Sequence, residues 1–223
     1  EPDIDKSGWL LPLDQNLQLD DAARAQTHDF IIERQVGRRA LVGSTEANTP
    51  IIEGSFENVL DILQAHLGAH DFLFGDRPGR ADFALYGQLK PMLWWDPTPM
   101  AVAVERAPRA VNWIERVDDL AWWPVDGDDG WAALDQLDGT VRDLLVEAGR
   151  TYVPFMLANA AALESGADEV VCAIEGAEYR QAPFKYQRMC LQWLREEFGA
   201  LGDDERSRVD DVLAGTGCEV LLR

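Results

Sequence analysis

The sequence is poor in basic residues. Its 223 residues include only 20 Lys and Arg against 40 Asp and Glu, so the formal net charge is −20 at pH 7. Sequence-independent binding to nucleic acid needs basic surface that displaces counterions, and anionic membrane surfaces attract basic segments in the same way. The charge balance therefore argues against nucleic acid and membranes as partners, and is typical of an acidic exterior that keeps a protein soluble.

Cysteines and long apolar runs are also scarce. Cys172, Cys190 and Cys218 are odd in number and widely spaced, which fits neither a disulfide framework nor a C-x-x-C pair. We expect reduced, buried thiols and a cytoplasmic location. The first ten residues lack the basic and then apolar pattern of a signal peptide, and no apolar run reaches the roughly 20 residues of a membrane-spanning helix.

The common catalytic motifs are missing. The sequence contains no G-x-S-x-G elbow, P-loop or G-x-G-x-x-G fingerprint, each of which would place a nucleophile or a phosphate at a defined turn. Ser44, Ser55 and Ser165 have no base near them in the sequence. We therefore assign no catalytic residue to this chain.

Two stretches come close to a metal-binding pattern. Asp126–Gly130 begins like a calcium loop, but Trp131 and Leu137 stand where that loop needs Gly and Glu, so we expect an acidic linker. His66 and His70 are four residues apart and could face one metal ion. Gly68 separates them, and Asp71 is the only obvious further ligand nearby. We expect solvent-facing histidines at a helix end and no metal site.

The sequence is rich in apolar residues spaced three and four apart. The length of 223 residues allows one large domain or two small ones, and hydrophobic residues make up 47% of the chain, enough for a sizeable core. The spacing is typical of amphipathic helices, which we expect over 22–39, 50–67, 80–89, 108–117, 141–148, 154–163, 184–201 and 203–214, with a short one ending at Arg106. The fold class predicted is mainly all-α.

Other stretches break this pattern. Residues 1–19 are acidic and interrupted by Pro2, Gly8 and Pro12, which favours a loop or extended lead-in. Gly149 and Pro154 are expected to end one helix and begin the next. Residues 169–182 alternate around Glu175-Gly176, which predicts a small β-hairpin. The acidic, glycine-containing stretch 118–130 is the best boundary within the chain.

The clearest helix start lies within 72–89. Pro78 and Gly79 stop what precedes them, and the Asp82 carboxylate can reach back to the free amides of the first turn and complement the helix dipole. Pro78 and Phe83 occupy the two ends of a hydrophobic staple. We expect the following apolar residues to form a buried face: Phe83, Leu85, Tyr86 and Leu89.

This segment resembles the start of the central buried helix in the C-terminal domain of glutathione transferases. Asp82 matches the Asp of the family's Ser/Thr-x-x-Asp capping box, and Gly79 stands where Ser or Thr is usual. Residues 107–113 resemble the family's P-x-v-x-x-W helix. The resemblance covers Pro50 to about Leu120, and Tyr152–Leu222 resembles the tail of a bacterial glutathione transferase-like subgroup.

The resemblance implies a domain organisation and an activity. Residues 20–125 would be the helical bundle, after the lead-in 1–19, and 126–223 a helical extension that includes the hairpin. The intact protein would join glutathione, its cosubstrate, to a small hydrophobic electrophile, and the family is usually dimeric, which points to a homodimer. In that family the thiol-activating residue and the glutathione site lie in a thioredoxin-like N-terminal domain. The chain begins at Glu1 without Met, so we expect that domain upstream, and no cofactor in this chain.

The role of the tryptophans and the function of the chain both stay open. The resemblance places a hydrophobic substrate wall in the helical domain, for which Trp94, Trp95 and Arg38 are candidates, but tryptophan pairs also serve core or interface packing. Helical domains of this kind also act as non-catalytic modules for protein partners. Besides the enzyme and the protein-interaction module, a third reading is a helical domain unrelated to the family.

Overall fold

The structure is a computed structural model that describes residues 2–123, 127 and 129–223, so Asp126 and Asp128 of the acidic linker lie outside the described residues. It confirms a mainly helical fold with one hairpin. The helices are α1 (Pro2–Gln15), α2 (Asp21–Arg38), α3 (Thr49–His66), α4 (Arg80–Lys90), α5 (Pro97–Arg106), α6 (Pro108–Asp118), α7 (Gly139–Ser165), α8 (Lys185–Ala200) and α9 (Asp203–Leu213). Shorter helical turns are η1 (Arg39–Val42), η2 (Pro91–Trp95), η3 (Leu134–Gln136) and η4 (Cys218–Leu222).

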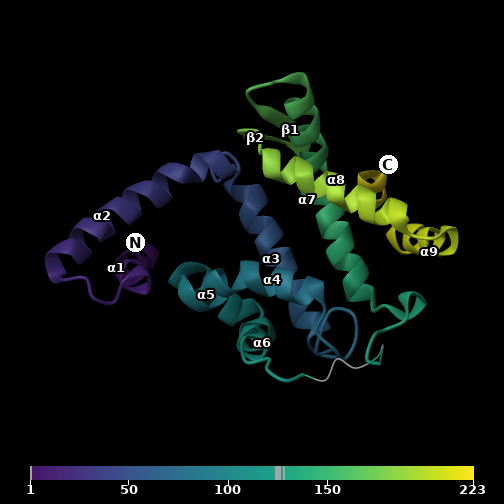
Figure 1. Ribbon diagram of the computed structural model, residues 1–223, viewed down its shortest axis with the longest axis horizontal. Helices are drawn as coiled ribbons and strands as arrows, with labels where there is room; N and C mark the ends of the chain where they lie inside the picture. The colour runs from purple at the N-terminus through teal and green to yellow at the C-terminus, as the bar shows by residue number, and fades with distance from the viewer. Residues whose placement is uncertain (1, 124–126, 128) are drawn as a thin grey trace.

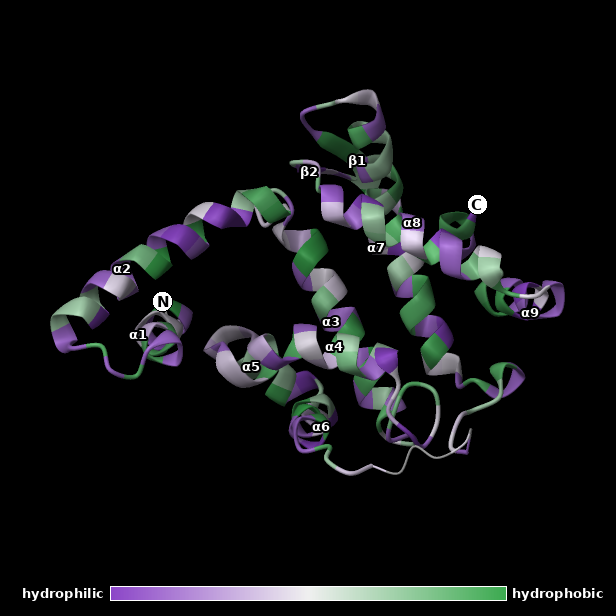
Figure 2. Cartoon of the chain, viewed as in Figure 1, coloured by the Kyte–Doolittle hydropathy of each residue, from purple (hydrophilic) through white to green (hydrophobic). Residues whose placement is uncertain are grey.

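Two hydrophobic cores lie on either side of the contact between α3 and α7 (Figure 1). The first core joins α3 to α6 and includes Leu60, Leu63, Leu93, Trp113 and Ile114. The second joins α7, the hairpin, α8 and η4. Figure 2 shows the hydrophobic residues alternating with hydrophilic ones along these helices. The spacing predicted for α3 and α6 is confirmed, because the residues at intervals of three and four are the buried ones.

The prediction of an extended lead-in over 1–19 is wrong, because residues 2–15 form α1. Pro2 is the first helical residue, where its fixed φ suits a helix and its missing N–H costs nothing. Asp3 and Asp5 lie in the first turn, at the positive end of the helix dipole. The Asp3 carboxylate accepts a hydrogen bond from the Thr98 N–H at 2.7 Å, so α1 is fastened to α5.

Helices α1 and α2 form an arm that projects from the two cores (Figure 1). The chain exposes 13722 Å² of surface, whereas a compact monomer of 24.9 kDa would expose about 10,200 Å². Several large apolar side chains in the arm and in the turns beside its helices contribute to this excess, among them Leu17, Phe30, Leu41 and Val42. The described chain is therefore an open molecule with more surface than its mass requires.

The helix break predicted at Gly149 and Pro154 is also wrong, because α7 is one helix of 27 residues. Gly149 allows a close contact between α7 and the turn before η4. A Cβ at this position would lie 1.9 Å from the carbonyl oxygen of Thr216, so only glycine lets the turn before η4 touch the helix. Pro154 removes one intrahelical hydrogen bond, and the neighbouring buried residues Val153, Phe155 and Met156 hold that part of α7 in the second core.

The predicted hairpin is confirmed. Strands β1 (Val170–Ile174) and β2 (Ala177–Gln181) pair antiparallel, with Val170 opposite Gln181 and Ile174 opposite Ala177. Glu175 and Gly176 both have positive φ, at 53° and 76°, as the type I′ turn of a two-residue hairpin requires. Val170 and Ile174 point into the second core against α7.

The start of α4 depends on the buried Asp82 carboxylate. Its Oδ1 accepts from the Leu73 N–H and its Oδ2 from the Gly79 N–H, both at 2.9 Å. Burial raises the pKa of this carboxyl, and these hydrogen bonds partly offset that rise. Gly79 lies against Trp131, whose ring would be 3.0 Å from an added Cβ. That contact explains why glycine stands where a Ser or Thr is expected.

The face of α4 differs from the predicted one by one residue. Asp82, Leu85, Tyr86 and Leu89 face the first core, at the intervals of three and four that define one side of a helix. Phe83 is 49% exposed, so the prediction that it is buried is wrong. Asp82, the polar capping residue, occupies the buried position, and the neighbouring Phe83 faces solvent.

We predict that Asp82→Ala lowers the free energy of unfolding by about 2–4 kcal/mol, because two buried amides lose their acceptor. Chemical denaturation of the full chain measures this. Asp76→Ala is the matched control, since Asp76 is exposed in the same loop, and it should change stability by less than about 0.5 kcal/mol. Equal effects of the two substitutions would contradict the role given to Asp82.

A second prediction contrasts two helical glycines. Gly149→Ala should destabilise the chain by about 1–3 kcal/mol, because the new methyl group must push Thr216 away. Gly199→Ala should stabilise it by up to about 1 kcal/mol, since a Cβ there meets nothing within 4 Å in α8. The same denaturation experiment reports both. A neutral or stabilising Gly149→Ala would rule out the close contact.

Candidate functional site

The structure does not bring the predicted pocket residues together. Trp94 and Trp95 lie in η2, where the Trp94 carbonyl accepts from Lys6 Nζ at 3.5 Å and the same ammonium lies 5.6 Å from the Trp95 ring centre. Arg38 is exposed at the far end of α2, beside the start of α3 (Figure 1). This geometry favours the packing interpretation, in which the tryptophans hold α1 against the body.

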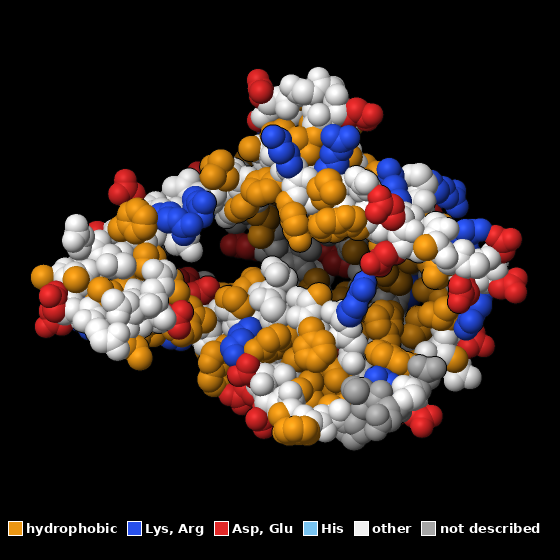
Figure 3. Space-filling view, in the orientation of Figure 1, with side chains coloured by type: hydrophobic (Ala, Val, Ile, Leu, Met, Phe, Trp, Pro, Cys, Tyr) orange, Lys and Arg blue, Asp and Glu red, His pale blue; other side chains and the backbone are white. Residues whose placement is uncertain are grey.

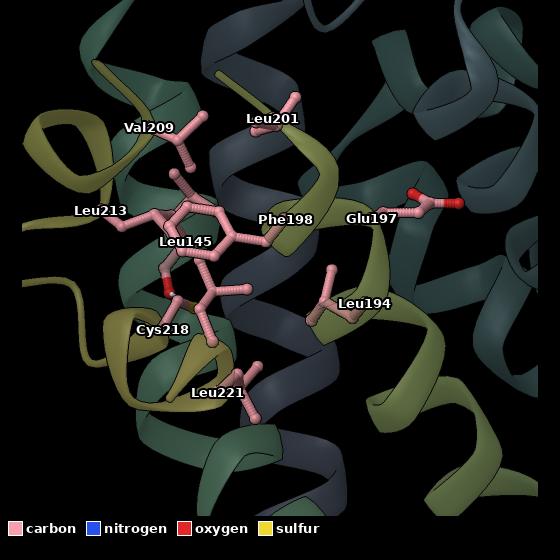
Figure 4. A pocket seen from close by; sticks show the side chains of 10 residues that line it. Leu145, Leu194, Glu197, Phe198, Leu201, Val209, Leu213, Cys218 and Leu221 are labelled. Atoms are coloured by element: carbon pink, nitrogen blue, oxygen red, sulfur yellow. Dashed lines mark hydrogen bonds between the residues drawn. The ribbon is translucent and has the colours of Figure 1, made fainter. Parts of the chain in front are cut away.

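A different apolar pocket lies between α7, α8, α9 and η4 (Figure 4). Its volume is about 380 Å³, which falls within the range of small-molecule sites. The apolar side chains that line it are Leu145, Leu194, Phe198, Leu201, Val209, Leu213, Cys218, Leu221 and Leu222. Figure 4 shows the Glu197 carboxylate pointing away from this group, and it pairs with Arg80 at 3.3 Å.

One wall of this pocket, η4, is positioned by the glycine contact in α7. Gly149 allows Thr216 and Gly217 to lie against α7, and Gly217 then takes a left-handed φ of 85° before η4. This brings Cys218 to Leu145, whose carbonyl accepts from the thiol Sγ at 3.2 Å. Burial raises the pKa of the Cys218 thiol. The thiol is therefore protonated at neutral pH and packs as an apolar group, because the nucleophile would be the thiolate.

Sequence reasoning missed this pocket for a physical reason. The apolar stripe of α8 indicated that the helix packs, but the pocket needs the docking of α9 and η4, which the spacing within α8 does not specify. Only Leu191 of α8 is fully buried. Tyr186, Met189 and Trp193 remain exposed on the same helix, with the Tyr186 and Trp193 rings edge to face at 6.0 Å.

A polar cluster forms where α3 ends and α7 begins. His66 is 1% exposed, so the prediction that both histidines face solvent is wrong for this residue. The rings of His66 and His70 lie 4.9 Å apart, and His70 Nε2 is 3.1 Å from Asp138 Oδ2. Asp71, the nearby candidate from the sequence, instead pairs with Arg116.

Hydrogen bonds fix this cluster from several sides. His66 Nε2–H donates to the Phe72 carbonyl at 3.1 Å, and Nδ1 lies 2.7 Å from the Thr140 hydroxyl. Asp138 caps α7 by accepting from the Thr140 N–H at 2.9 Å. Burial lowers the pKa of His66, and hydrogen bonds from the Thr140 hydroxyl and amide lower the pKa of Asp138. Sequence reasoning missed Asp138 because it lies 68 residues beyond His70.

Comparisons with known proteins identify one part of the chain. In the described residues, no helix is both long and apolar enough to cross a membrane. Searches of curated proteins and of solved structures found no match. Residues 22–116 match the family model for the glutathione S-transferase C-terminal domain. This range takes in α2 to α5 and nearly all of α6, including the α4 start that carries Asp82. The chain therefore carries a glutathione S-transferase C-terminal domain over residues 22–116.

Proposed function

We propose that this chain is the helical part of a glutathione S-transferase-like protein and holds the non-polar electrophile that is joined to glutathione. The observation that carries the proposal is the family match over residues 22–116. In the reaction, the glutathione thiolate attacks an electrophilic carbon, forms a C–S bond and displaces a leaving group or adds to an activated double bond. A separate glutathione-binding domain would activate the thiol.

The apolar pocket supports a binding role for this chain. Its lining offers apolar carbon surface and a protonated thiol but no charged group directed inward. Such a site retains non-polar molecules by removing their surface from water, which is worth about 25 cal/mol per Å². The residues that line the pocket lie beyond residue 116, so we assign electrophile binding to the extension 126–223. We assign residues 20–125 to the family domain.

A second candidate function is a protein-interaction module with this helical fold. The observation in its favour is the exposed stripe of Tyr186, Met189 and Trp193 along α8, where Tyr186 is 67% and Trp193 45% exposed. Figure 3 shows apolar side chains gathered over this helix. Aromatic residues and Met are enriched at protein interfaces. The partner in this reading is a second copy of the chain, which gives a homodimer.

Filling the pocket tests the ligand-binding part of the proposal. Val209→Phe should abolish the blue-shifted fluorescence of a naphthalene-sulfonate probe bound to the full chain, because the larger ring occupies the cavity. Val146→Phe introduces the same ring at an exposed position of α7 and should leave probe binding unchanged. If both variants bind the probe like the original chain, this cavity does not hold the apolar molecule.

The enzyme reading is tested on the intact protein and on this chain in parallel. We predict that the intact protein binds immobilised glutathione and conjugates it to a chlorodinitrobenzene electrophile, followed by absorbance. The 223-residue chain alone should show no turnover, because no thiol-activating residue of the family matches it. Turnover by the chain alone would place the activating group within it. An intact protein without glutathione affinity, combined with a sedimenting mass of twice 24.9 kDa for the chain, would favour the interaction module.

A further inference from the structure

We propose that a cavity between α6 and the loop joining α3 to α4 binds a small organic cation that carries a quaternary ammonium group. The cavity has a volume of about 390 Å³, which falls within the range of small-molecule sites. Helix α6 and the loop lie near each other at the lower edge of the view in Figure 1, where Trp113 Nε1–H donates to the Asp71 carbonyl at 3.0 Å. The cavity shares no lining residue with the apolar pocket between α7, α8, α9 and η4, so this proposal goes beyond electrophile binding.

Aromatic side chains form the apolar walls of this cavity. Trp113 from α6 and Phe72 from the loop are 4% and 5% exposed and belong to the first core, which fixes both rings in place. The Trp123 ring meets the Phe72 ring edge to face, with the ring centres 5.5 Å apart. The face of an aromatic ring attracts a cation that lies within about 6 Å of the ring centre, and tryptophan does so most strongly. Two tryptophans and one phenylalanine around a single cavity are therefore suited to an ammonium ion.

An uncommon backbone conformation accompanies the third wall. Trp122 has a positive φ of 59°, which is a genuine outlier for a bulky side chain. Such conformations cluster at functional sites, where the surrounding structure maintains them. The Trp122 side chain is 100% exposed, whereas the next residue, Trp123, is 39% exposed and lines the cavity. The two neighbouring tryptophans therefore have different roles, and only the second faces the proposed ligand.

The charged side chains around the cavity favour positive charge in the ligand. Asp71, Glu115 and Asp119 line the cavity together with one arginine, Arg116. The Arg116 guanidinium pairs with the Asp71 carboxylate at 3.1 Å. Among the residues that the structure describes, Glu115 and Asp119 have no ion-pair partner. Two uncompensated carboxylates thus remain at a cavity of a chain whose formal net charge is −20, and clefts lined by one sign of charge concentrate ions of the other sign.

The combination of aromatic rings and carboxylates favours an organic cation over other ligands. An anion would meet Glu115 and Asp119, and the one guanidinium of the cavity is already held by Asp71. A non-polar molecule would take water from these carboxylates without giving them a partner, which costs free energy. A quaternary ammonium group suits both parts of the lining, because its methyl groups are apolar and its charge is attracted by ring faces and by carboxylates.

Isothermal titration calorimetry of the full chain tests the proposal by comparing choline with 3,3-dimethylbutan-1-ol, a neutral molecule of the same shape. The expected result is one saturable site for choline. The affinity for the neutral molecule should be at least about tenfold lower, because it lacks the charge that the rings and carboxylates attract. Sodium chloride at about 0.15 M in every titration screens the long-range attraction of cations to the acidic chain.

Matched variants locate the site. Trp123→Ala removes one wall and should weaken choline binding at least about fivefold, whereas Trp122→Ala removes a fully exposed ring outside the lining and should leave the affinity unchanged. Glu115→Gln should also weaken binding, and Glu53→Gln, at an exposed position of α3, should not. Three results would overturn the proposal: no saturable choline site on the unmodified chain, equal affinities for choline and the neutral molecule, or a Trp123→Ala or Glu115→Gln affinity equal to that of its control.

Discussion

The loop between α3 and α4 depends on one buried carboxylate. Asp82 accepts hydrogen bonds from the Leu73 and Gly79 amides and is 0% exposed. Leu73 lies in the middle of this loop and Gly79 at its end, so one side chain fixes the backbone at both points. The Phe72 carbonyl meets His66, and the Phe74 carbonyl accepts from the Ala132 N–H at 2.8 Å. The carboxylate that starts α4 therefore also fixes where the extension attaches.

The same loop explains how the family domain and the extension form one molecule. The Asp76 N–H donates to the Gly130 carbonyl at 2.8 Å, and Trp131 packs over Gly79. Arg77 adds a guanidinium 4.7 Å from the Trp131 ring centre. Residues 130–132 are thus joined to the loop between α3 and α4 by backbone hydrogen bonds and by the contacts of Trp131 with Gly79 and Arg77. A serine or threonine at position 79 would strengthen the cap but displace that ring.

An element could be predicted from the sequence where the residues that determine it lie close together in the chain. The helices α3 and α6 were predictable because their apolar residues recur at intervals of three and four, and the hairpin because Glu175-Gly176 carries its own turn signal. Asp82 was predictable as a cap because its partner Gly79 is three residues away. The structure adds that this cap also binds Leu73, nine residues before it.

The failures concern residues whose role is set by distant segments. Gly149 is typical of a helix end, yet here it admits Thr216, which is 67 positions away in the sequence and close in space. His66 is polar at a helix end, yet it is buried because Phe72 and Thr140 supply its partners. The apolar pocket belongs to this class too, since Leu145 and Cys218 are 73 residues apart. Local pattern carries no information on such pairs.

The acidic charge constrains what can cover the exposed apolar stripe of α8. Arginines hold carboxylates in pairs, as Arg106 does with Glu57 and Asp61, yet a formal charge of −20 remains. Two copies of the chain repel each other, and salt screens that repulsion beyond a Debye length of about 8 Å.

A stable contact between copies must therefore be apolar at its centre and carry local basic charge. The first half of α8 meets both conditions, because Lys185 and Arg188 flank Tyr186 and Met189, while Glu196 and Glu197 lie in its second half. An antiparallel pair of these helices would set the basic half of one copy near the acidic half of the other. The stripe on α8 thus combines exposed apolar area with local basic charge, which lowers the electrostatic cost of self-association there.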